Sequence, residues 1–225
     1  MLKQSNQFHA LLKGVTCFLF DLDGTLIDSS PCHERAFFKV LEADMPHLLE
    51  TFVYDEHKGK STKETFQALG IVEGEQLSTM TIKKQETYRR MVDDGEVVAF
   101  PSARELLQSL KDRGHRSWVV TGASRRSAEA SLSRLEFLHF FEALIAGDET
   151  GKTKPAPDLY LKCIADHGLD TRQALAIEDA LPGIQSARAA GLNVVAVNNP
   201  ELSHLPEYVG TLQDLHEIWL LATND

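Results

Sequence analysis

The sequence has few cysteines and no long apolar run. Cys17, Cys32 and Cys163 are far apart and lack CxxC spacing, which argues against a disulfide framework and a cysteine zinc site. No segment reaches the roughly 18 consecutive apolar residues of a membrane span. Residues 1–14 lack the apolar stretch of a secretion signal. We therefore expect a cytoplasmic protein, in a reducing compartment, with no membrane partner.

Basic residues are also in the minority. The chain has 23 Lys and Arg against 33 Asp and Glu, a formal net charge of −10. Such a chain repels polyanions, so nucleic acid is not an expected partner. A small phosphorylated metabolite is compatible with this charge, because one local site can reverse the field. With 225 residues, 43% of them hydrophobic, the chain can bury a core, and we expect a monomer.

Five short apolar runs have the composition of buried parallel strands, and each is followed by polar or small residues. They cover residues 16–20, 117–120, 143–146, 174–177 and 194–197. Helical patterns between them cover residues 102–113, 125–135, 157–167 and 182–190. Ser102 and Glu105 predict a capping box, and Gly191 a helix end. This alternation predicts an α/β fold with a doubly wound parallel sheet, whose ligand lies beyond the carboxyl ends of the strands.

Residues 29–98 break this rhythm. Their pattern is helical, with no convincing buried strand, and the predicted helices cover residues 31–42, 61–69 and 75–93. Because the strand pattern resumes only near residue 117, this block is interpreted as an insertion after the first strand. The predicted domains are a catalytic core of residues 1–28 and 99–225 and a helical cap of residues 29–98.

Two aspartates follow the first strand. Asp21 and Asp23 are one residue apart, so in extended geometry their side chains point to the same side of the chain. Two carboxylates so close repel each other unless one is protonated or a cation lies between them. Mg²⁺, which prefers oxygen ligands, is the natural cation. The alternative is a simple turn, since Asp and Gly24 favour turns anyway.

Three further strand ends carry polar residues suited to a phosphate and magnesium site. Thr121 and Gly122 place a hydroxyl and free N–H groups before a helix start, where anions bind. Lys154 lies in a proline-bracketed loop, and Glu178 and Asp179 form a second acidic pair. Taken singly, these residues could be helix caps or solvated surface groups. Their joint occurrence at the ends of predicted parallel strands favours one functional site.

The motifs FLFDLDGTLID, WVVTGAS, KTKPAPDLYL and AIEDALPGIQSARAAG resemble, in this order, the four motifs of the haloacid dehalogenase-like hydrolase superfamily. The helical block resembles the cap of its β-phosphoglucomutase and phosphoglycolate phosphatase branch. The resemblance covers nearly all of residues 16–197. It implies a Rossmann-like core with an inserted α-helical cap domain, and a phosphoric monoester hydrolase acting on a small phosphorylated metabolite.

The resemblance also implies catalytic roles. Asp21 matches the nucleophile that forms an aspartyl-phosphate, and Asp23 matches the group that protonates the leaving oxygen and then activates water. Aspartate at the second position is typical of phosphoryl transfer and not of dehalogenation. The same resemblance assigns Thr121, Gly122 and Lys154 to binding the phosphoryl group.

The metal site is likewise implied by resemblance. Mg²⁺ would be held by the Asp21 carboxylate, the Asp23 backbone carbonyl and Asp179, with Glu178 close by or bonded through water. One position departs from the pattern, because many relatives have serine where this chain has Ala180. That change removes a supporting hydroxyl but no ligand.

The cap and rim supply the predicted substrate contacts. His33 matches a histidine placed near the catalytic aspartate, and Lys84 matches a cap lysine that meets the substrate. The alternatives are a half-buried helix histidine and a solvated lysine. Lys58 and Gly59 lie in the stretch that resembles the specificity loop of the cap, and Arg125 is the predicted rim contact.

Two other functions stay open at this point. A sugar phosphomutase shares every core residue, but Thr62 stands where the mutase carries an arginine that grips a second phosphate. The absence of this charge favours hydrolysis, although a small shift in alignment would bring Lys58, Lys60 or Lys63 to that place. A non-catalytic, phosphate-binding regulatory protein would usually lack one member of the acidic set, and this chain has them all.

Overall fold

The computed structural model describes residue 8 and residues 11–223. A six-stranded, all-parallel sheet has the order β5-β4-β1-β6-β7-β8. Its strands are β1 (Cys17–Phe20), β4 (Arg116–Val120), β5 (Ala143–Ile145), β6 (Ala174–Glu178), β7 (Asn193–Val197) and β8 (Tyr208–Gly210). Phe20 of β1 pairs with Val119 on one side and Ile177 on the other. The carboxyl ends of β4, β1 and β6 are therefore neighbours.

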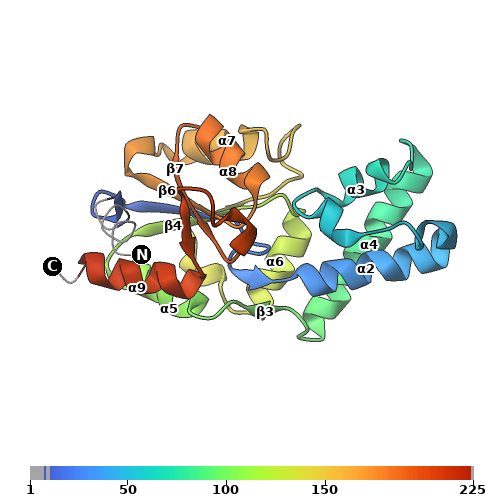
Figure 1. Cartoon of the computed structure of the whole chain (residues 1–225), viewed down its shortest axis with the longest axis horizontal. Helices are drawn as coiled ribbons and strands as arrows, with labels where there is room; N and C mark the ends of the chain where they lie inside the picture. Colours follow the sequence, from blue (N-terminus) through green and yellow to red (C-terminus); the bar gives the residue numbers. More distant parts are fainter. Residues whose placement is uncertain (1–7, 9–10, 224–225) are drawn as a thin grey trace.

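Helices cover both faces of this sheet (Figure 1). One face carries α5 (Ala103–Asp112), α6 (Arg125–Arg134) and α9 (Leu212–Thr223), and the other carries α7 (Asp158–His167) and α8 (Leu181–Ala189). Phe18 and Phe20 point into the first layer with Trp219, whereas Leu19 between them points into the second with Tyr160. This alternation is the period of two of a strand buried on both sides. The prediction of a doubly wound, Rossmann-like core is confirmed.

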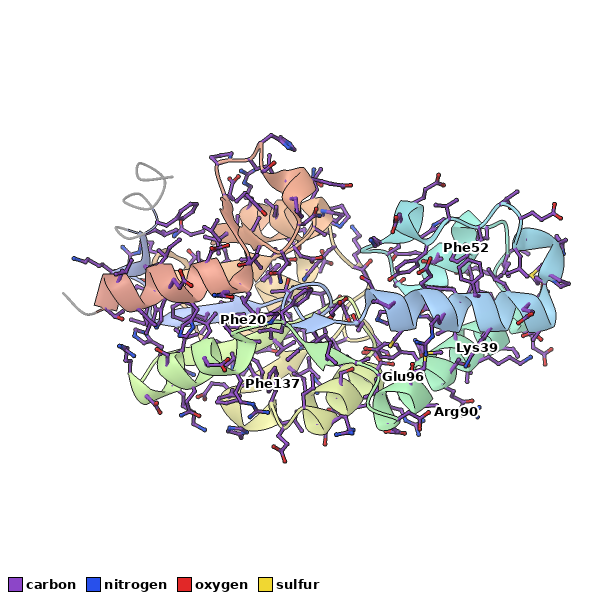
Figure 2. The ribbon with its side chains drawn as sticks, turned by 60° about the horizontal axis from the view of Figure 1, so that its bottom comes forward. Phe20, Lys39, Phe52, Arg90, Glu96 and Phe137 are labelled. Atoms are coloured by element: carbon purple, nitrogen blue, oxygen red, sulfur yellow. The ribbon has the colours of Figure 1, made fainter. Side chains whose placement is uncertain are left out.

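The helical cap has an apolar core of its own. It contains α2 (Ser30–Asp44), α3 (Thr62–Ala68) and α4 (Glu75–Asp93), which lie to the right of the sheet in Figure 1. Phe37, Phe52 and Phe66 pack together inside it. Figure 2 shows Phe52 in this part of the molecule, well away from Phe20 and Phe137 in the core. The cap therefore folds around a separate hydrophobic cluster.

The chain leaves the core and re-enters it at one place. β2 (Ile27–Asp28) pairs antiparallel with β3 (Val98–Ala99), so both connections to the cap run side by side. The sequence pattern did not predict these two strands, which are too short to show a period. We propose cap boundaries after residue 28 and before residue 99, next to this pair of strands. Residues 1–7, 9–10 and 224–225 of the predicted core segments lie outside the described residues.

Most predicted helices agree with the structure to within two residues at each end, but one predicted cap is wrong. Ser102 has φ 63° and its side chain makes no capping hydrogen bond to α5, because the left-handed backbone at this position turns the hydroxyl away from the helix start. Ser61 and Glu64 form a complete capping box at the start of α3 instead. Short 3-10 turns occur at Pro46–Leu48, Tyr54–His57, Leu138–Phe140, Thr171–Gln173 and Pro200–Leu202.

Two further expectations from the sequence concern membrane-spanning helices and disulfides. Among the described residues, no helix combines the length and apolar character needed to cross a bilayer. Cys17, Cys32 and Cys163 are all buried and free, as expected from their spacing.

Candidate active site

The strand ends meet the cap at a cavity of about 810 Å³. Core residues around it include Asp21, Asp23, Thr121, Gly122, Lys154, Glu178 and Asp179. Cap residues around it include His33, Lys58, Gly59, Thr62 and Lys84. The structure thus brings together residues up to 158 positions apart, counting from Asp21 to Asp179. Because every strand of the sheet is parallel, all these loops leave the same edge.

Lys154 is the centre of the buried charge network. Its Nζ donates to Asp21 Oδ1 at 2.6 Å and to the Val120 carbonyl at 2.8 Å, and it lies 2.7 Å from Glu178 Oε1. Burial alone would lower the pKa of this lysine, but Asp21 and Glu178 hold it above its ordinary value. Lys154 therefore keeps its positive charge directly beside the Asp21 carboxylate.

Three carboxylates gather beside this lysine. Asp21, Glu178 and Asp179 each place an oxygen within 4.8 Å of the others. Burial raises the pKa of Asp179 to about 7, and the neighbouring Glu178 charge adds to the effect. Burial also raises the pKa of Asp21 well above its usual range, against the opposing charge of Lys154. The negative charges are in excess over the one ammonium group, as expected where a cation belongs.

The shape of the acidic cluster fits a hard cation. A Cβ on Gly24, whose φ is +86°, would lie 2.0 Å from Asp179 Oδ2, so a side chain there would displace this carboxylate. A Cβ on Gly183 would likewise lie 2.0 Å from Glu178 Oε2. The donor set contains only oxygen atoms, which suits Mg²⁺ better than zinc or copper.

Asp23 lies apart from this cluster. Its Oδ1 accepts a hydrogen bond from Ser29 Oγ at 2.5 Å and lies 3.2 Å from His33 Nε2. Burial works against ionisation of Asp23, but the hydrogen bond from His33, the charge of His33 and the bond from Ser29 together lower its pKa. The two aspartates of the motif therefore occupy different electrostatic environments, which is the arrangement that separates a nucleophile from an acid and base.

His33 and Lys84 extend the network from Asp23 into the cap. Lys84 Nζ lies 2.6 Å from His33 Nδ1, and the His33 ring stacks on Tyr88 at 4.0 Å between centroids. Burial lowers the pKa of Lys84 to about 7 and, together with Lys84, lowers that of His33. When Lys84 is charged it can only donate, so in that state Nδ1 of His33 accepts and Nε2 carries the proton toward Asp23. Lys84 is buried, and not the solvated lysine of the alternative interpretation.

The loop after β4 offers hydrogen-bond donors to the cavity. Thr121 is buried, and its Oγ1 accepts from the Ala123 N–H at 3.1 Å, which leaves the hydroxyl proton for another acceptor. A Cβ on Gly147 would lie 2.2 Å from the Gly122 carbonyl oxygen, so the loop after β5 packs closely against this turn. Helix α6 begins directly behind it, with its N-terminal dipole toward the cavity edge.

The cap loop, residues 57–63, closes one side of the cavity. Lys58 pairs with Asp55 at 2.7 Å and Lys63 pairs with Glu73 at 2.8 Å. Lys60 instead contacts uncharged groups, the Glu56 carbonyl oxygen at 3.2 Å and His57 Nδ1 at 3.3 Å. Burial and the Lys60 charge lower the pKa of His57. Lys60 is thus the cap-loop cation whose charge is least compensated.

Arg125 is not brought to the cavity. Its guanidinium donates to the Leu144 carbonyl at 2.6 Å, to Glu149 at 2.5 Å and to Glu129 at 3.1 Å, and it is absent from the described residues that line the cavity. These three acceptors hold the side chain along the outside of α6. The predicted rim contact is therefore replaced by a surface ion-pair cluster.

Sequence reasoning missed a buried tyrosine in this site. The Tyr160 hydroxyl donates to Glu178 Oε1 at 2.5 Å, and its ring lies 5.2 Å from Lys154 Nζ. Lys154 and Tyr160 together occupy Oε1, which leaves Oε2 of Glu178 for a cation or water. Leu159 and Tyr160 form part of an apolar stretch of α7 that indicates only burial, so nothing in the sequence predicts the hydrogen bond from Tyr160 to Glu178.

Comparison with known proteins agrees with the motifs. A model of the haloacid dehalogenase-like hydrolase family matches residues 18–197. The chain belongs to this family. Within the family it is 34% identical over 188 residues to fructose-1-phosphate phosphatase YqaB of Escherichia coli K12, covering 80% of this chain and 94% of that protein. The family match and this phosphatase relative confirm the expectation of a phosphoric monoester hydrolase.

Two further members of the family are similar over most of the chain. β-Phosphoglucomutase of Bacillus subtilis 168 is 28% identical over 216 residues, covering 89% of this chain and 94% of that protein. The crystal structure of CbbY from Rhodobacter sphaeroides in complex with phosphate has a TM-score of 0.78 at 24% identity, covering 94% of this chain and all of that chain. The last likeness concerns the fold. The predicted branch, with its inserted cap, is confirmed.

Proposed function

We propose that this hydrolase is a Mg²⁺-dependent phosphatase that transfers the phosphoryl group of a small metabolite to Asp21 and then to water. One observation carries the proposal: Asp21 pairs with Lys154 and clusters with Glu178 and Asp179, whereas Asp23, two residues on, is held separately by Ser29 and His33. Both aspartates line the same cavity. We further propose that the protein is cytoplasmic and monomeric.

Asp21 is the proposed nucleophile. One carboxylate oxygen attacks phosphorus, the bond to the ester oxygen breaks, and an aspartyl-phosphate forms. The Lys154 ammonium, 2.6 Å from Asp21 Oδ1, is close enough to stabilise negative charge on the transferring group. The Thr121 hydroxyl and the N–H groups around Gly122 supply donors for the phosphoryl oxygens.

Asp23 is the proposed acid and base. In its protonated form it gives a proton to the leaving alkoxide in the first step, and the resulting carboxylate takes one from water in the second. The bonds from Ser29 and His33 favour its ionised form, which is the form that activates water. In the first step the ester oxygen that leaves phosphorus accepts the proton from Asp23.

Asp21, Asp179 and the Asp23 backbone carbonyl are the proposed ligands of Mg²⁺, with Glu178 adjacent. When bound, the metal ion supplies positive charge to the transferring phosphoryl oxygens. The buried, oxygen-only cluster and the raised pKa values of Asp21 and Asp179 support this assignment.

The cap favours a phosphorylated compound with hydroxyl groups. His33, Lys84, Lys58 and Gly59 line the cavity together with polar side chains such as Gln85, so a sugar-like body would find hydrogen-bond partners there. The relative named fructose-1-phosphate phosphatase supports a sugar monophosphate. We propose this class of substrate.

A sugar phosphomutase is the second candidate, because Lys60 lines the cavity and its ammonium makes no close ion pair with a carboxylate of the described residues, and one relative is a β-phosphoglucomutase. Thr62 also lines the cavity and carries no charge for a second phosphate. A single, flexible lysine grips a phosphate less firmly than a bidentate arginine. We therefore favour hydrolysis.

The test is a phosphate-release assay. Fructose 1-phosphate, other sugar phosphates, phosphoglycolate and nucleotides would each be incubated with the full chain, with Mg²⁺ and with excess chelator. We expect release of inorganic phosphate from at least one small phosphomonoester, and loss of that release in chelator. No release from the whole panel, or undiminished release in chelator, would overturn the proposal.

A further inference from the structure

Asn198, directly after β7, binds the loop that contains Asp21 and Asp23. Its Nδ2 donates to the carbonyl oxygens of Gly24 at 3.0 Å and Thr25 at 2.9 Å. Its Oδ1 accepts from the Leu212 N–H at 2.8 Å. Two acceptors on one side and one donor on the other also fix which way the amide faces.

The backbone at this position is specialised as well. Asn198 has φ 61°, in the left-handed region, and its N–H donates to the Gly210 carbonyl at 2.8 Å. Asparagine adopts this region more readily than most residues other than glycine. Of the side chains that tolerate it, only the amide offers both a double donor and an acceptor, whereas aspartate would face two carbonyl oxygens with negative charge.

Asn199 binds the opposite loop. Its Nδ2 donates to the Asp179 carbonyl oxygen at 2.9 Å, and its Oδ1 accepts from the Glu201 N–H at 3.1 Å. Asn199 also lines the cavity. Two consecutive residues at one strand end therefore hold backbone atoms of both acidic loops, in opposite halves of the sequence.

The two loops touch where spacing is tightest. The carbonyl oxygen of Gly24 accepts a hydrogen bond from Asn198. Because Gly24 has no Cβ, it leaves room for Asp179 Oδ2, which would lie only 2.0 Å from a Cβ at this position. The carboxylates of Asp21, Glu178 and Asp179 repel one another across this contact. Lys154 offsets part of this repulsion by pairing with Asp21 and Glu178. The neutral hydrogen bonds from Asn198 and Asn199 hold the backbone of the two loops.

We propose that Asn198 and Asn199 are positioning residues that clamp the Gly24–Thr25 and Asp179 loops at the spacing Mg²⁺ needs. This inference rests on the proposed Mg²⁺-dependent function. The clamp acts through backbone carbonyl oxygens of the two loops and supplies no metal ligand. Its loss weakens metal binding first and lowers turnover as a consequence.

The experiment compares Asn198→Gly, Asn198→Asp and Asn199→Ala with the unaltered full chain. Asn198→Gly keeps the left-handed backbone without cost and removes only the amide. Mg²⁺ binding is measured by calorimetry without substrate, and hydrolysis with p-nitrophenyl phosphate over a range of Mg²⁺ concentrations. We expect the Mg²⁺ dissociation constant to rise about tenfold or more in Asn198→Gly and further in Asn198→Asp, with much of the lost turnover restored at saturating Mg²⁺.

Asn193→Ala is the matched control, since this exposed asparagine lies at the other end of β7 and should leave both measurements unchanged. A dissociation constant within twofold of the unaltered protein in folded Asn198→Gly and Asn199→Ala would overturn the clamp. If Asn198→Gly does not fold, Asn199→Ala alone decides. An unaltered protein that binds no Mg²⁺ and releases no phosphate would instead contradict the proposed function.

Discussion

Single residues decide how the two aspartates of the motif differ. Asp21 lies 2.6 Å from a charged lysine and beside two carboxylates, whereas Asp23 accepts hydrogen bonds from Ser29 and His33. One residue separates the two aspartates in sequence, and we propose attack on phosphorus for Asp21 and proton transfer for Asp23. A substitution at either position should therefore affect different substrates differently.

Asp23→Asn tests the proton-transfer role. A sugar alkoxide is a poor leaving group and needs a proton, so we expect kcat/KM for a sugar phosphate to fall by about 10²–10⁴. For p-nitrophenyl phosphate, whose leaving group needs no proton, the fall should be much smaller. Asp166→Asn, in an exposed pair with Lys162, is the control. Equal losses on both substrates would count against the assignment.

The sequence indicated some of these residues and not others, for a physical reason. Asp21, Thr121 and Asp179 lie next to the ends of predicted strands and Lys154 lies in the loop after another, and parallel strands bring their carboxyl ends to one edge. Contacts that depend on side-chain direction left no such pattern. The Arg125 guanidinium turned to Glu149 and Glu129 on the surface.

Asn198 is a contact residue that the sequence did not indicate. It binds Gly24 and Thr25 across 174 and 173 positions, and its sequence neighbourhood resembles an ordinary turn. Tyr160 was equally unmarked, because a tyrosine among apolar residues of a helix indicates only burial.

Among secondary-structure elements, periodicity predicted the long ones well and the short ones poorly. Helix α4 has the predicted bounds, Glu75–Asp93, because 19 residues give several turns of amphipathic pattern. The half-buried strand β8 (Tyr208–Gly210) was not predicted, since three residues show no period and the sheet's edge accepts a mixed composition. The 12-residue helix α9 (Leu212–Thr223) was not predicted either and is an exception among the longer elements. The cap predicted at Ser102 was wrong because the capping rule assumes extended backbone, whereas the backbone of Ser102 is left-handed.

The cap loop carries the distinction between hydrolysis and isomerisation. Given β-glucose 1-phosphate with a trace of the 1,6-bisphosphate, the protein should release inorganic phosphate in step with any substrate consumed. Thr62 carries no charge to hold the second phosphate of the bisphosphate. The charge-assisted bonds that an arginine would make are worth roughly 1.5–3 kcal/mol each, so without them the bisphosphate should stay bound for a time shorter by about tenfold or more. Glucose 6-phosphate and phosphate are followed together.

Lys60→Ala sharpens this test, because Lys60 is the cap-loop cation with the least compensated charge. Lys58→Ala, which removes a lysine already paired with Asp55, is the matched comparison. Stoichiometric conversion to glucose 6-phosphate without phosphate release, abolished in Lys60→Ala but kept in Lys58→Ala, would identify a mutase and place the second phosphate on Lys60.

Over the whole molecule, lysines and carboxylates both line the cavity of an acidic protein. The net charge is −10, yet lysines from both cap and core line the cavity, namely Lys58, Lys60, Lys63, Lys84, Lys152 and Lys154. Seven carboxylates also line the cavity, namely Asp21, Asp23, Glu64, Glu73, Asp148, Glu178 and Asp179, so a bound cation would add to the attraction that the lysines exert on a small anion. The acidic cluster beneath these lysines adds a dependence on pH.

Mg²⁺ affinity should rise with pH. Burial and the Glu178 charge raise the pKa of Asp179 to about 7, so in the metal-free protein this carboxyl holds a proton below that pH. The cation binds the ionised form and must displace the proton. We expect the apparent dissociation constant to increase by up to about tenfold per pH unit below pH 7 for each proton displaced, and to level off above it.

Calorimetry between pH 5.5 and 8.5 measures this dependence, and repeating it in buffers of different ionisation enthalpy counts the protons released. An affinity that stays constant across this range, with no proton release, would show that the carboxylates are already ionised without the metal. In that case Asp179 would not be the titrating ligand.

The most direct test of the central claim is phosphate release by Asp21→Asn at saturating Mg²⁺, on the best substrate of the unaltered protein. An amide of the same shape keeps the fold but cannot attack phosphorus, so turnover should fall by at least about a thousandfold while thermal unfolding stays near that of the unaltered chain. Turnover within tenfold of the unaltered protein would contradict an aspartyl-phosphate on Asp21.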